Sequence, residues 1–320
     1  MNPVRIGFVM DPITSINPKK DTTLAIMLEA QSRGWSIVYM ELKDLFLENG
    51  VAKARMHSVH VKDDSKNWFE IKGSETGNLG DLDFLFMRKD PPFDIEYIMS
   101  TYILEKAEAQ GAMVINKPQG LRDANEKVFT SWFPQCCPES LLTRSGTFIL
   151  DFLEKHQKIV IKPTCKMGGK SIFVLIKGDP NVNVIIEEVT KNGEEYVQVQ
   201  KYISEISTTG DKRIILIDGK PVEYGLARFP SKGDHRGNLA AGGSGKGFKL
   251  SERDRWICKE IGPGLVKKGL LFAGIDVIGD YLTEINVTSP TCIQEINKEF
   301  NINIAGRLLD CVIKKLNSSL

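Results

Sequence analysis

Apolar residues are grouped in short blocks through the first third of the chain. Strand-like runs occupy residues 4–10, 36–40, 83–87 and 112–115, and helical spacing occupies residues 22–33 and 95–110. Strands that alternate with helices form a parallel sheet, and ligands bind at the carboxyl ends of its strands. The pattern therefore predicts an N-terminal parallel α/β domain, with Asp11 and Arg88 at the carboxyl ends of two strands.

Beyond residue 118 the pattern changes to helices and to strands that are joined through tight turns. Helical spacing covers residues 121–132, 145–156, 251–268 and 304–316, and strand-like runs cover residues 159–162, 171–176, 196–200, 213–217, 222–227, 271–278 and 281–287. Asp218-Gly219 separates two of these runs, which is typical of an antiparallel hairpin. We therefore expect a mostly antiparallel α+β region after the first domain.

The composition excludes several classes of protein. The 320 residues include 42 Lys and Arg and 41 Asp and Glu, so the net charge is +1. A protein that coats nucleic acid or an anionic membrane needs a net basic surface, and this balance argues against one. No apolar run approaches the roughly 20 residues of a membrane span, and residues 4–10 are too few for a signal peptide. Six cysteines without a Cys-x-x-Cys pair favour reduced thiols in a cytoplasmic protein.

Two glycine-rich segments are candidates for loops that close over a ligand. Gly169-Lys170-Ser171 matches the end of a phosphate-binding P-loop, but Thr164 stands where the first glycine should be, and a β-rich run follows. We interpret this segment as a hairpin tip whose backbone N–H groups and Lys170 can close over phosphates, with a plain turn as the alternative. Residues 229–247 form a longer stretch, which we interpret as a lid, with a disordered insertion as the alternative.

Oxygen-bearing side chains gather near the end of the chain. Glu284 and Asn286 are two apart on one predicted strand and so point to one face, and Asp276 lies on the preceding strand. A two-residue turn at Gly279-Asp280 would put Asp276 on the opposite face from Glu284, whereas a three-residue turn would place the two carboxylates across from each other. Together the three side chains suit Mg²⁺ that is shared with substrate phosphates. Apolar neighbours argue against the alternative of a solvated polar face, because buried carboxylates need a cation.

Basic residues are spread over the same part of the chain: Lys127, Lys162, Arg213, Arg228 and Arg236. Lys162 ends an apolar strand, a position that is costly for an ammonium group unless an anion lies beside it. Each of these residues alone would be assigned to the surface. Together with the acidic hairpin and the two glycine-rich segments, they favour a site for phosphates and a divalent cation.

Several motifs together resemble the ATP-grasp ligases, and among these the bacterial glutathione synthetase family. The motifs are Asn125-Glu126-Lys127, Ile161-Lys162-Pro163, Met167-Gly168-Gly169, the stretch from Arg236 to Gly243, and Thr283-Glu284-Ile285-Asn286-Val287-Thr288-Ser289-Pro290. The narrower resemblance rests on Met10-Asp11-Pro12, Met87-Arg88-Lys89-Asp90-Pro91-Pro92 and Asn116-Lys117-Pro118. The resemblance implies an α/β substrate domain at residues 1–122, followed by a two-lobed ATP-grasp fold with antiparallel sheets. Its central lobe would span residues 123–203 and its C-terminal lobe residues 204–320.

The resemblance also implies an activity, the ATP-dependent joining of γ-glutamylcysteine to glycine through an acyl phosphate. Two Mg²⁺ ions, or Mn²⁺ in their place, would be held by Asp276, Glu284 and Asn286. Nucleotide-binding roles fall to Lys127, Lys162, Gly168, Gly169, Gln200, Lys201, Tyr202, Ile203 and Asp211, with an adenine-binding hinge at residues 200–203. Catalytic roles fall to Arg213, Arg228 and Arg236, and dipeptide-binding roles to Asp11, Arg88, Ser289, Pro290 and Thr291. The implied partners are small molecules and further copies of the chain in a homotetramer.

The sequence departs from the family pattern at two places. Cys165-Lys166 precedes Met167 where the family usually has Asp-Gly, and Ser244 stands where the family commonly has Arg. Both places lie in predicted loops, so they bear on loop closure and rate more than on the type of reaction. Two alternatives stay open: another ATP-grasp carboxylate–amine ligase, or a nucleotide-binding regulator without catalysis. The intact set of predicted metal ligands argues against the regulator.

Overall fold

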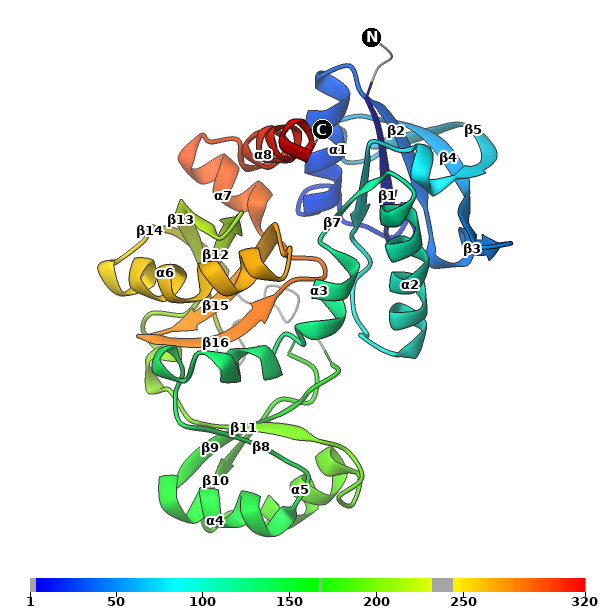
Figure 1. Cartoon of the computed structure of the whole chain (residues 1–320). Helices are drawn as coiled ribbons and strands as arrows, with labels where there is room; N and C mark the ends of the chain where they lie inside the picture. The colour runs from blue at the N-terminus through cyan, green and yellow to red at the C-terminus, as the bar shows by residue number, and fades with distance from the viewer. Residues whose placement is uncertain (1–3, 167–168, 232–243, 320) are drawn as a thin grey trace.

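Three β-sheets form the framework of the protein in the computed structural model, which describes residues 4–166, 169–231 and 244–319 (Figure 1). In this part of the chain, β1 to β7 form a seven-stranded sheet, β8 to β11 a four-stranded sheet and β12 to β16 a five-stranded sheet. The four-stranded sheet belongs to a separate lobe, which lies below β15 and β16 in the view of Figure 1. We call it the central lobe, because it is central in the sequence.

The centre of the N-terminal sheet is parallel, as the sequence predicts. Its strands pair in the order β2 (Ser36–Met40), β1 (Arg5–Val9), β6 (Phe84–Met87) and β7 (Met113–Ile115). They are nearly continuous runs of buried residues, because α1 (Thr22–Ser32) and α2 (Ile95–Ala109) pack on opposite faces of the sheet. Each helix begins at an aspartate, Asp21 or Asp94, whose carboxylate accepts a hydrogen bond from a backbone N–H of the first turn.

Antiparallel strands that the sequence analysis did not predict extend this sheet beyond β2. They are β3 (Leu45–Glu48), β4 (Val51–Val61) and β5 (Phe69–Asn78), and short 3-10 helices, η1 (Leu42–Asp44) and η2 (Leu79–Asp81), flank them. Buried and exposed positions alternate along β4, whereas almost every residue of β5 is exposed. An exposed strand needs no apolar face, so its sequence carries no clear period of two.

The predicted helix at residues 121–132 is two short helices, α3 (Pro118–Asp123) and the 3-10 helix η3 (Val128–Trp132). Asn125 lies between them, and its Oδ1 accepts hydrogen bonds from the backbone N–H groups of Lys127 and Val128, both at 3.1 Å. This local bonding competes with the helix and ends it. The chain therefore makes a turn between the two helices.

The sheet of the central lobe is antiparallel, with the strand order β10–β9–β11–β8. The elements of this lobe are β8 (Ser140–Thr143), α4 (Gly146–His156), β9 (Lys158–Pro163), β10 (Phe173–Ile176), α5 (Val182–Thr190) and β11 (Val197–Lys201); the 3-10 helices η4 (Pro134–Cys136) and η5 (Ser204–Ser207) precede and follow it. Both helices cover the same side of the sheet, away from the rest of the molecule (Figure 1). The other side is left to face β15 and β16.

The C-terminal sheet is antiparallel, in the order β14–β13–β12–β15–β16. Its strands are β12 (Asp211–Ile217), β13 (Lys220–Phe229), β14 (Ser244–Lys249), β15 (Phe272–Ile278) and β16 (Tyr281–Asn286), and its helices are α6 (Glu252–Lys267), α7 (Ile293–Phe300) and α8 (Ile304–Ser319). The end of the predicted lid at residues 229–247 is thus regular strand, while residues 232–243 lie outside the described residues. Gly247 suits this strand because a Cβ there would lie 2.4 Å from the Phe300 ring.

Apolar packing divides the molecule differently from the chain order. One buried cluster joins Leu85 of the N-terminal sheet to Ile275 and Leu282 of the C-terminal sheet. The central lobe instead has a smaller core of its own, which contains Ile161 and Val199. The first and last sheets therefore form one packed body, against which the central lobe is placed as a second unit.

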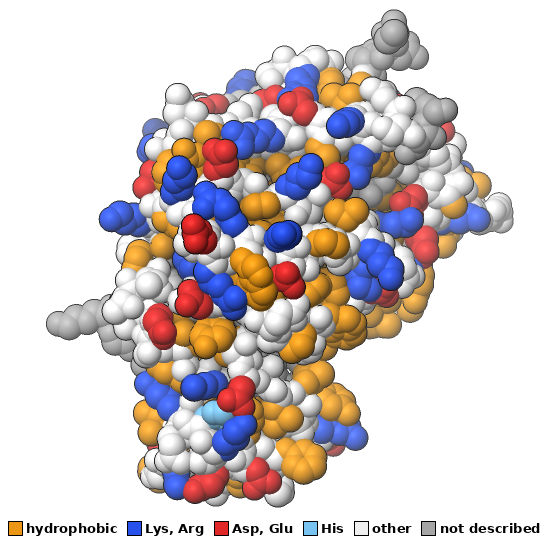
Figure 2. Space-filling view, turned by 60° about the vertical axis from the view of Figure 1, so that its left-hand side comes forward, with side chains coloured by type: hydrophobic (Ala, Val, Ile, Leu, Met, Phe, Trp, Pro, Cys, Tyr) orange, Lys and Arg blue, Asp and Glu red, His pale blue; other side chains and the backbone are white. Residues whose placement is uncertain are grey.

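The surface carries both signs of charge. Positive and negative side chains are interspersed over the face shown in Figure 2, in keeping with the net charge of +1. In the described part of the chain, no helix is long and apolar enough to cross a membrane.

Candidate active site

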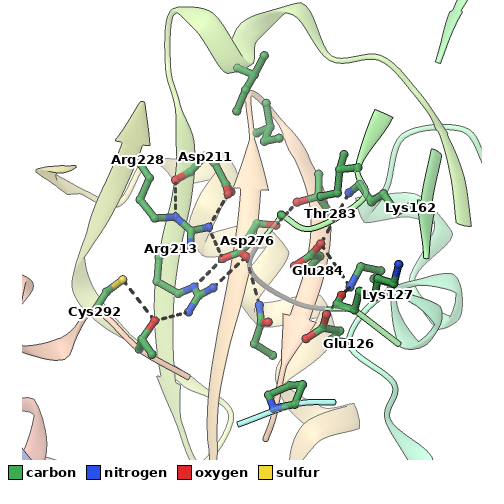
Figure 3. A pocket seen from close by; sticks show the side chains of 18 of the residues that line it. Glu126, Lys127, Lys162, Asp211, Arg213, Arg228, Asp276, Thr283, Glu284 and Cys292 are labelled. Atoms are coloured by element: carbon green, nitrogen blue, oxygen red, sulfur yellow. Dashed lines mark hydrogen bonds and ion pairs between the residues drawn. The ribbon is translucent and has the colours of Figure 1, made fainter. Parts of the chain in front are cut away.

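A cavity of about 640 Å³ lies where the central lobe meets the packed body. This volume is ordinary for a site that binds a small molecule. Figure 3 shows acidic and basic side chains of the C-terminal sheet pointing into the cavity, with two lysines on its other side. The charged residues that line it are Lys20, Asp21, Asp90, Glu126, Lys127, Lys162, Lys166, Lys201, Asp211, Arg213, Arg228, Asp276, Glu284 and Glu295.

The acidic hairpin is formed by β15 and β16, whose register places Asp276 directly opposite Glu284. The connecting turn is the two-residue Gly279-Asp280, yet the carboxylates still face each other because the register shifts after Asp276, which makes Thr283 a β-bulge. The hydroxyl of Thr283 donates a hydrogen bond to the Asp276 carbonyl at 3.1 Å. The prediction that this pairing needs a three-residue turn is wrong, because the bulge and not the turn supplies the extra residue.

Asp276 is the centre of a buried ion network. Nε and Nη2 of Arg213 donate to its two carboxylate oxygens at 2.6 and 3.0 Å, and Arg228 Nη2 lies 2.9 Å from its Oδ1 and 2.5 Å from Oδ2 of Asp211. Burial alone would raise the pKa of Asp276, but the two guanidinium groups outweigh burial and lower it. Asp211 is affected in the opposite direction, since burial raises its pKa to about 7 despite Arg228. The Asp276 carboxylate is therefore ionised and fixed in position.

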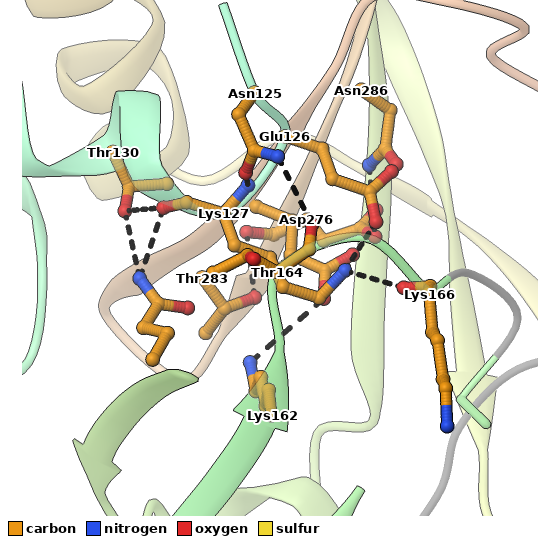
Figure 4. Close-up of polar contacts among 12 residues, drawn as sticks. Asn125, Glu126, Lys127, Thr130, Lys162, Thr164, Lys166, Asp276, Thr283 and Asn286 are labelled. Carbon is orange, nitrogen blue, oxygen red and sulfur yellow. Dashed lines mark hydrogen bonds and ion pairs between the residues drawn. The ribbon is translucent and has the colours of Figure 1, made fainter. Parts of the chain in front are cut away.

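The two lysines of the site approach the other carboxylate of the hairpin. Nζ of Lys127 and Nζ of Lys162 lie 4.0 and 3.9 Å from Oε1 of Glu284. Lys127 also contacts Glu126 and donates to the carbonyl of Lys166 at 2.8 Å, as Figure 4 shows. Burial lowers the pKa of Lys162, whereas at Lys127 the nearby carboxylates outweigh burial and raise the pKa. Both ammonium groups can thus meet an additional anion in the cavity.

The residues predicted as an adenine-binding hinge line the cavity at the end of β11. Oε1 of Gln200 accepts a hydrogen bond from Lys162 Nζ at 2.9 Å, while its Nε2 is buried without a partner among the described residues. The ammonium of Lys158 lies 3.7 Å from the centre of the Tyr202 ring. An unsatisfied amide donor beside a cavity fits a ligand that carries hydrogen-bond acceptors.

The residues predicted to bind a dipeptide divide into two groups. Ser289 and Thr291 line the cavity, and Thr291 Oγ1 accepts a hydrogen bond from Arg213 at 3.4 Å. Asp11, Arg88 and Pro290 are not among the lining residues. Nη2 of Arg88 instead donates to the Pro290 carbonyl at 2.9 Å, and the Asp11 carboxylate accepts the backbone N–H of residue 90 at 2.9 Å. These three residues therefore do not line the cavity themselves but support residues that do.

Residues from the loop before α1, from the segment after β6 and from α7 line the cavity without having been predicted. Lys20, Asp21, Asp90 and Glu295 surround the end that lies against the N-terminal sheet. Gln294 fixes the loop, because its Nε2 donates to the carbonyl of Asp21 at 2.5 Å. Burial raises the pKa of each of the three carboxyl groups. Only Asp90, within the Arg-Lys-Asp-Pro-Pro string, had a sequence signal that could have marked it.

The donor set of the hairpin fits a divalent ion that a phosphate completes. In the described ranges, no group of three or more His, Cys, Asp or Glu side chains forms a metal site by itself. Asp276 and Glu284 provide two carboxylates, and Asn286 donates Nδ2 to Asp276 at 3.2 Å, which leaves its amide oxygen for a ligand. Mg²⁺ is commonly held by one or two carboxylates together with substrate phosphates. Gly169 lies at the cavity, whereas Gly168 and Arg236 lie outside the described residues.

Comparisons with known proteins identify the family of the chain. Residues 4–122 and 126–301 match the family models for the N-terminal domain and the ATP-grasp domain of prokaryotic glutathione synthetase. The chain is 53% identical over 315 residues to a glutathione synthetase of Vibrio vulnificus, a match that covers 98% of this chain and 99% of that protein.

Solved structures show the same fold at low sequence identity. D-cycloserine synthetase DcsG has a TM-score of 0.71 at 12% identity, with 98% of this chain and 99% of that chain covered. The ATP-grasp ligase PsnB, complexed with a minimal precursor, Mg and ADP, has a TM-score of 0.61 at 14% identity and covers 98% of both chains. The solved structures agree in fold, and the family models with the 53% identical relative show that the chain is an ATP-dependent ligase and belongs to the prokaryotic glutathione synthetase family.

Proposed function

We propose that the protein joins γ-glutamylcysteine to glycine and so makes glutathione, converting ATP to ADP and phosphate through an acyl phosphate. The observation that carries the proposal is the facing of Lys127 and Lys162 against the Asp276–Glu284 hairpin, in one cavity of a chain from this family. A carboxylate does not accept an amine until it is activated, and phosphorylation supplies that activation. Phosphoryl transfer depends mainly on positioning and on neutralisation of charge.

The residues of the cavity divide the proposed work. Lys127 and Lys162 hold the phosphates of ATP, and residues 200–203 hold the adenine, with Gly169 and Asp211 also on the nucleotide side. Arg213 and Arg228 neutralise charge where the acyl phosphate forms. Asp276, Glu284 and Asn286 hold two Mg²⁺ ions, or Mn²⁺, which when bound neutralise the phosphate oxygens. Gly168 and Arg236 keep the roles that the resemblance implies, outside the described residues.

The end of the cavity against the N-terminal sheet is left for the dipeptide and glycine. Ser289 and Thr291 reach it directly, while Asp11, Arg88 and Pro290 shape its wall from behind. This assignment keeps the reacting carboxylate between the nucleotide phosphates and the incoming amine. A cavity enclosed by two lobes also limits the access of water to an acyl phosphate, which water would hydrolyse.

The proposed organisation follows the same division. We propose a substrate domain at residues 1–122, a central nucleotide-binding lobe at 123–203 and a C-terminal lobe at 204–320, assembled into a homotetramer. The six cysteines are all free, which supports a reducing cytoplasmic location. The substrates of the protein are small molecules.

The test is the dependence of phosphate release on both acceptor substrates. With ATP and Mg²⁺, we expect phosphate release only when γ-glutamylcysteine and glycine are both present, with glutathione formed in equal amount. D-Alanine in place of both substrates is the control for another ATP-grasp ligase and should release none. Phosphate release that is indifferent to the dipeptide would contradict the proposal.

A further inference from the structure

A buried glutamine that is absent from both the motifs and the cavity lining holds the main chain of Lys127. Nε2 of Gln198, on β11, donates to the Lys127 carbonyl at 2.9 Å and to Thr130 Oγ1 at 3.3 Å. The Thr130 hydroxyl donates to the same carbonyl at 2.6 Å (Figure 4). All three residues are at most 2% exposed, so water does not compete for these bonds. The peptide group of Lys127 is therefore fixed to β11.

Gln198 is also the cross-strand neighbour of the second lysine. The antiparallel register of β9 and β11 places it directly opposite Lys162, and residues in that relation point to the same side of a sheet. The two lysines come from different elements and yet approach one oxygen, Oε1 of Glu284, at nearly equal distances. Gln198 is the side chain that connects the main chain of one lysine to the strand pair that carries the other.

Other contacts fix the same segment in different directions. Asn125 Nδ2 donates to the Thr164 carbonyl at 3.0 Å, and the backbone N–H of Ile285 donates to the Glu126 carbonyl at 2.8 Å. These contacts join the segment to the loop after β9 and to the acidic hairpin. Among the residues that the structure describes, Gln198 is the one whose side chain joins this segment to β11, next to Lys162.

We propose that Gln198 is a positioning residue that sets the spacing of Lys127 and Lys162 for a single phosphate chain. This inference rests on the proposed phosphate-binding roles of the two lysines. Cations that are already spaced for the ligand stabilise its charge without reorganisation, so a loss of spacing weakens binding even though both lysines remain. Gln198 acts through Lys127 and needs no contact with the nucleotide.

The experiment measures the affinity for ADP with Mg²⁺ by titration calorimetry in a double-mutant cycle. Gln198→Met keeps the length of the side chain, and it removes the buried Oε1, which has no partner in the described part of the chain, together with the donor. The variant should therefore fold. We expect ADP to bind about fivefold more weakly, and less than about twofold more weakly when Lys127→Met is already present, because coupled residues are not additive.

A matched control removes an equally buried side-chain hydrogen bond from the same lobe. Thr190, which is 2% exposed, donates to the Ile186 carbonyl at 2.6 Å, away from both lysines. We expect Thr190→Val to lower the melting temperature and to leave ADP affinity within about twofold. In steady-state kinetics, Gln198→Met should raise the KM for ATP and leave the KM values for γ-glutamylcysteine and glycine unchanged.

The outcomes separate this inference from the proposed function. If Lys127→Met does not weaken ADP binding, the phosphate-binding role fails, and the inference fails with it. If Lys127→Met weakens binding but Gln198→Met does not, or does so by the same factor in both backgrounds, only the positioning role is overturned. Should Gln198→Met fail to fold, Thr130→Val, which removes the bridging hydroxyl, must show the same dependence on Lys127.

Discussion

The two sheets that face each other across the cavity hold their charged side chains in different ways. In the C-terminal sheet, Arg213 and Arg228 contact buried carboxylates directly, at 2.5 to 3.0 Å. In the central lobe, Lys162 donates to a neutral amide and stays 3.9 Å from the nearest carboxylate, Glu284. The two guanidinium groups are already paired without a ligand, whereas the second arrangement leaves its cation available to one. Loss of a carboxylate from the arginine network should therefore lower stability as well as activity, and damage around the lysines should act mainly on binding.

The largest effect is expected from Asp276→Asn. The substitution removes the charge that Arg213 and Arg228 share, and a buried ion left without its partner costs about 3 kcal/mol of the free energy of unfolding. Turnover should fall by roughly 10³, because the same carboxylate is proposed to hold Mg²⁺. Urea unfolding followed by circular dichroism and assays of phosphate release measure the two effects.

The control for this prediction is an exposed ion pair between the turn that joins β12 to β13 and helix α8. Asp218 lies 2.8 Å from Lys315, and both side chains are about one-third exposed. Asp218→Asn should change the free energy of unfolding by less than about 1 kcal/mol, as exposed pairs do. If Asp276→Asn and Asp218→Asn were equally stable, the buried ion network around Asp276 would contribute no more to stability than an exposed ion pair does.

Glu284→Gln should reduce turnover by about 10² and lower the free energy of unfolding by less than Asp276→Asn does. The Glu284 carboxylate lies 3.9 and 4.0 Å from the ammonium groups of the two buried lysines, so its charge stabilises both of them, but without the hydrogen bonds that Asp276 accepts from arginine. Removal of a negative charge beside the phosphate site should also tighten ADP binding in the presence of a chelator, by about threefold. Calorimetry without metal tests this sign, and surviving turnover would show that Glu284 is not a metal ligand.

Asn125→Asp should have a smaller effect, on both ATP binding and stability. The carboxylate can still accept the backbone N–H groups of Lys127 and Val128, but it cannot donate to the Thr164 carbonyl. We expect the KM for ATP to rise about threefold, with the free energy of unfolding lower by about 1 kcal/mol. Asn125→Ala, which also loses the two hydrogen bonds from the backbone N–H groups, is the comparison, and it should lower stability further.

The comparison also explains what could be predicted from the sequence. The central parallel strands were visible because they are buried on both faces and read as apolar runs. β5 was missed because nearly all of its residues are exposed. The facing of Asp276 and Glu284 was anticipated for the wrong reason, since no turn signal reveals a bulge at Thr283.

Among the site residues, those that belong to local strings were found, and those that depend on tertiary packing were not. Lys127 and Lys162 stand in motifs, so sequence placed them as candidates, and the structure brings them to one cavity. Gln198 and Glu295 have no such string. A polar glutamine on a strand is expected to face solvent. Gln198 is buried because residues 127–130 pack against β11. Contacts of this kind join segments far apart in the chain, where periodicity carries no information.

The smallest effect is expected from alkylation, which should reach the exposed thiol in the loop after β9 and not the thiols that are buried in the apolar core. Cys165 is exposed, whereas burial raises the pKa of Cys136 to about 11 and that of Cys258 to about 12. At pH 8 the buried thiols are only ~10⁻³ and ~10⁻⁴ ionised, and the thiolate is the reactive form. Iodoacetamide should therefore label Cys165 in the native protein and leave Cys136 and Cys258 unlabelled until urea is added. Peptide mass spectrometry reads out each position, with Cys165→Ser as the control. Labelling of Cys258 in the native protein would contradict this prediction, because it would mean that the reagent reaches the buried core of the packed body.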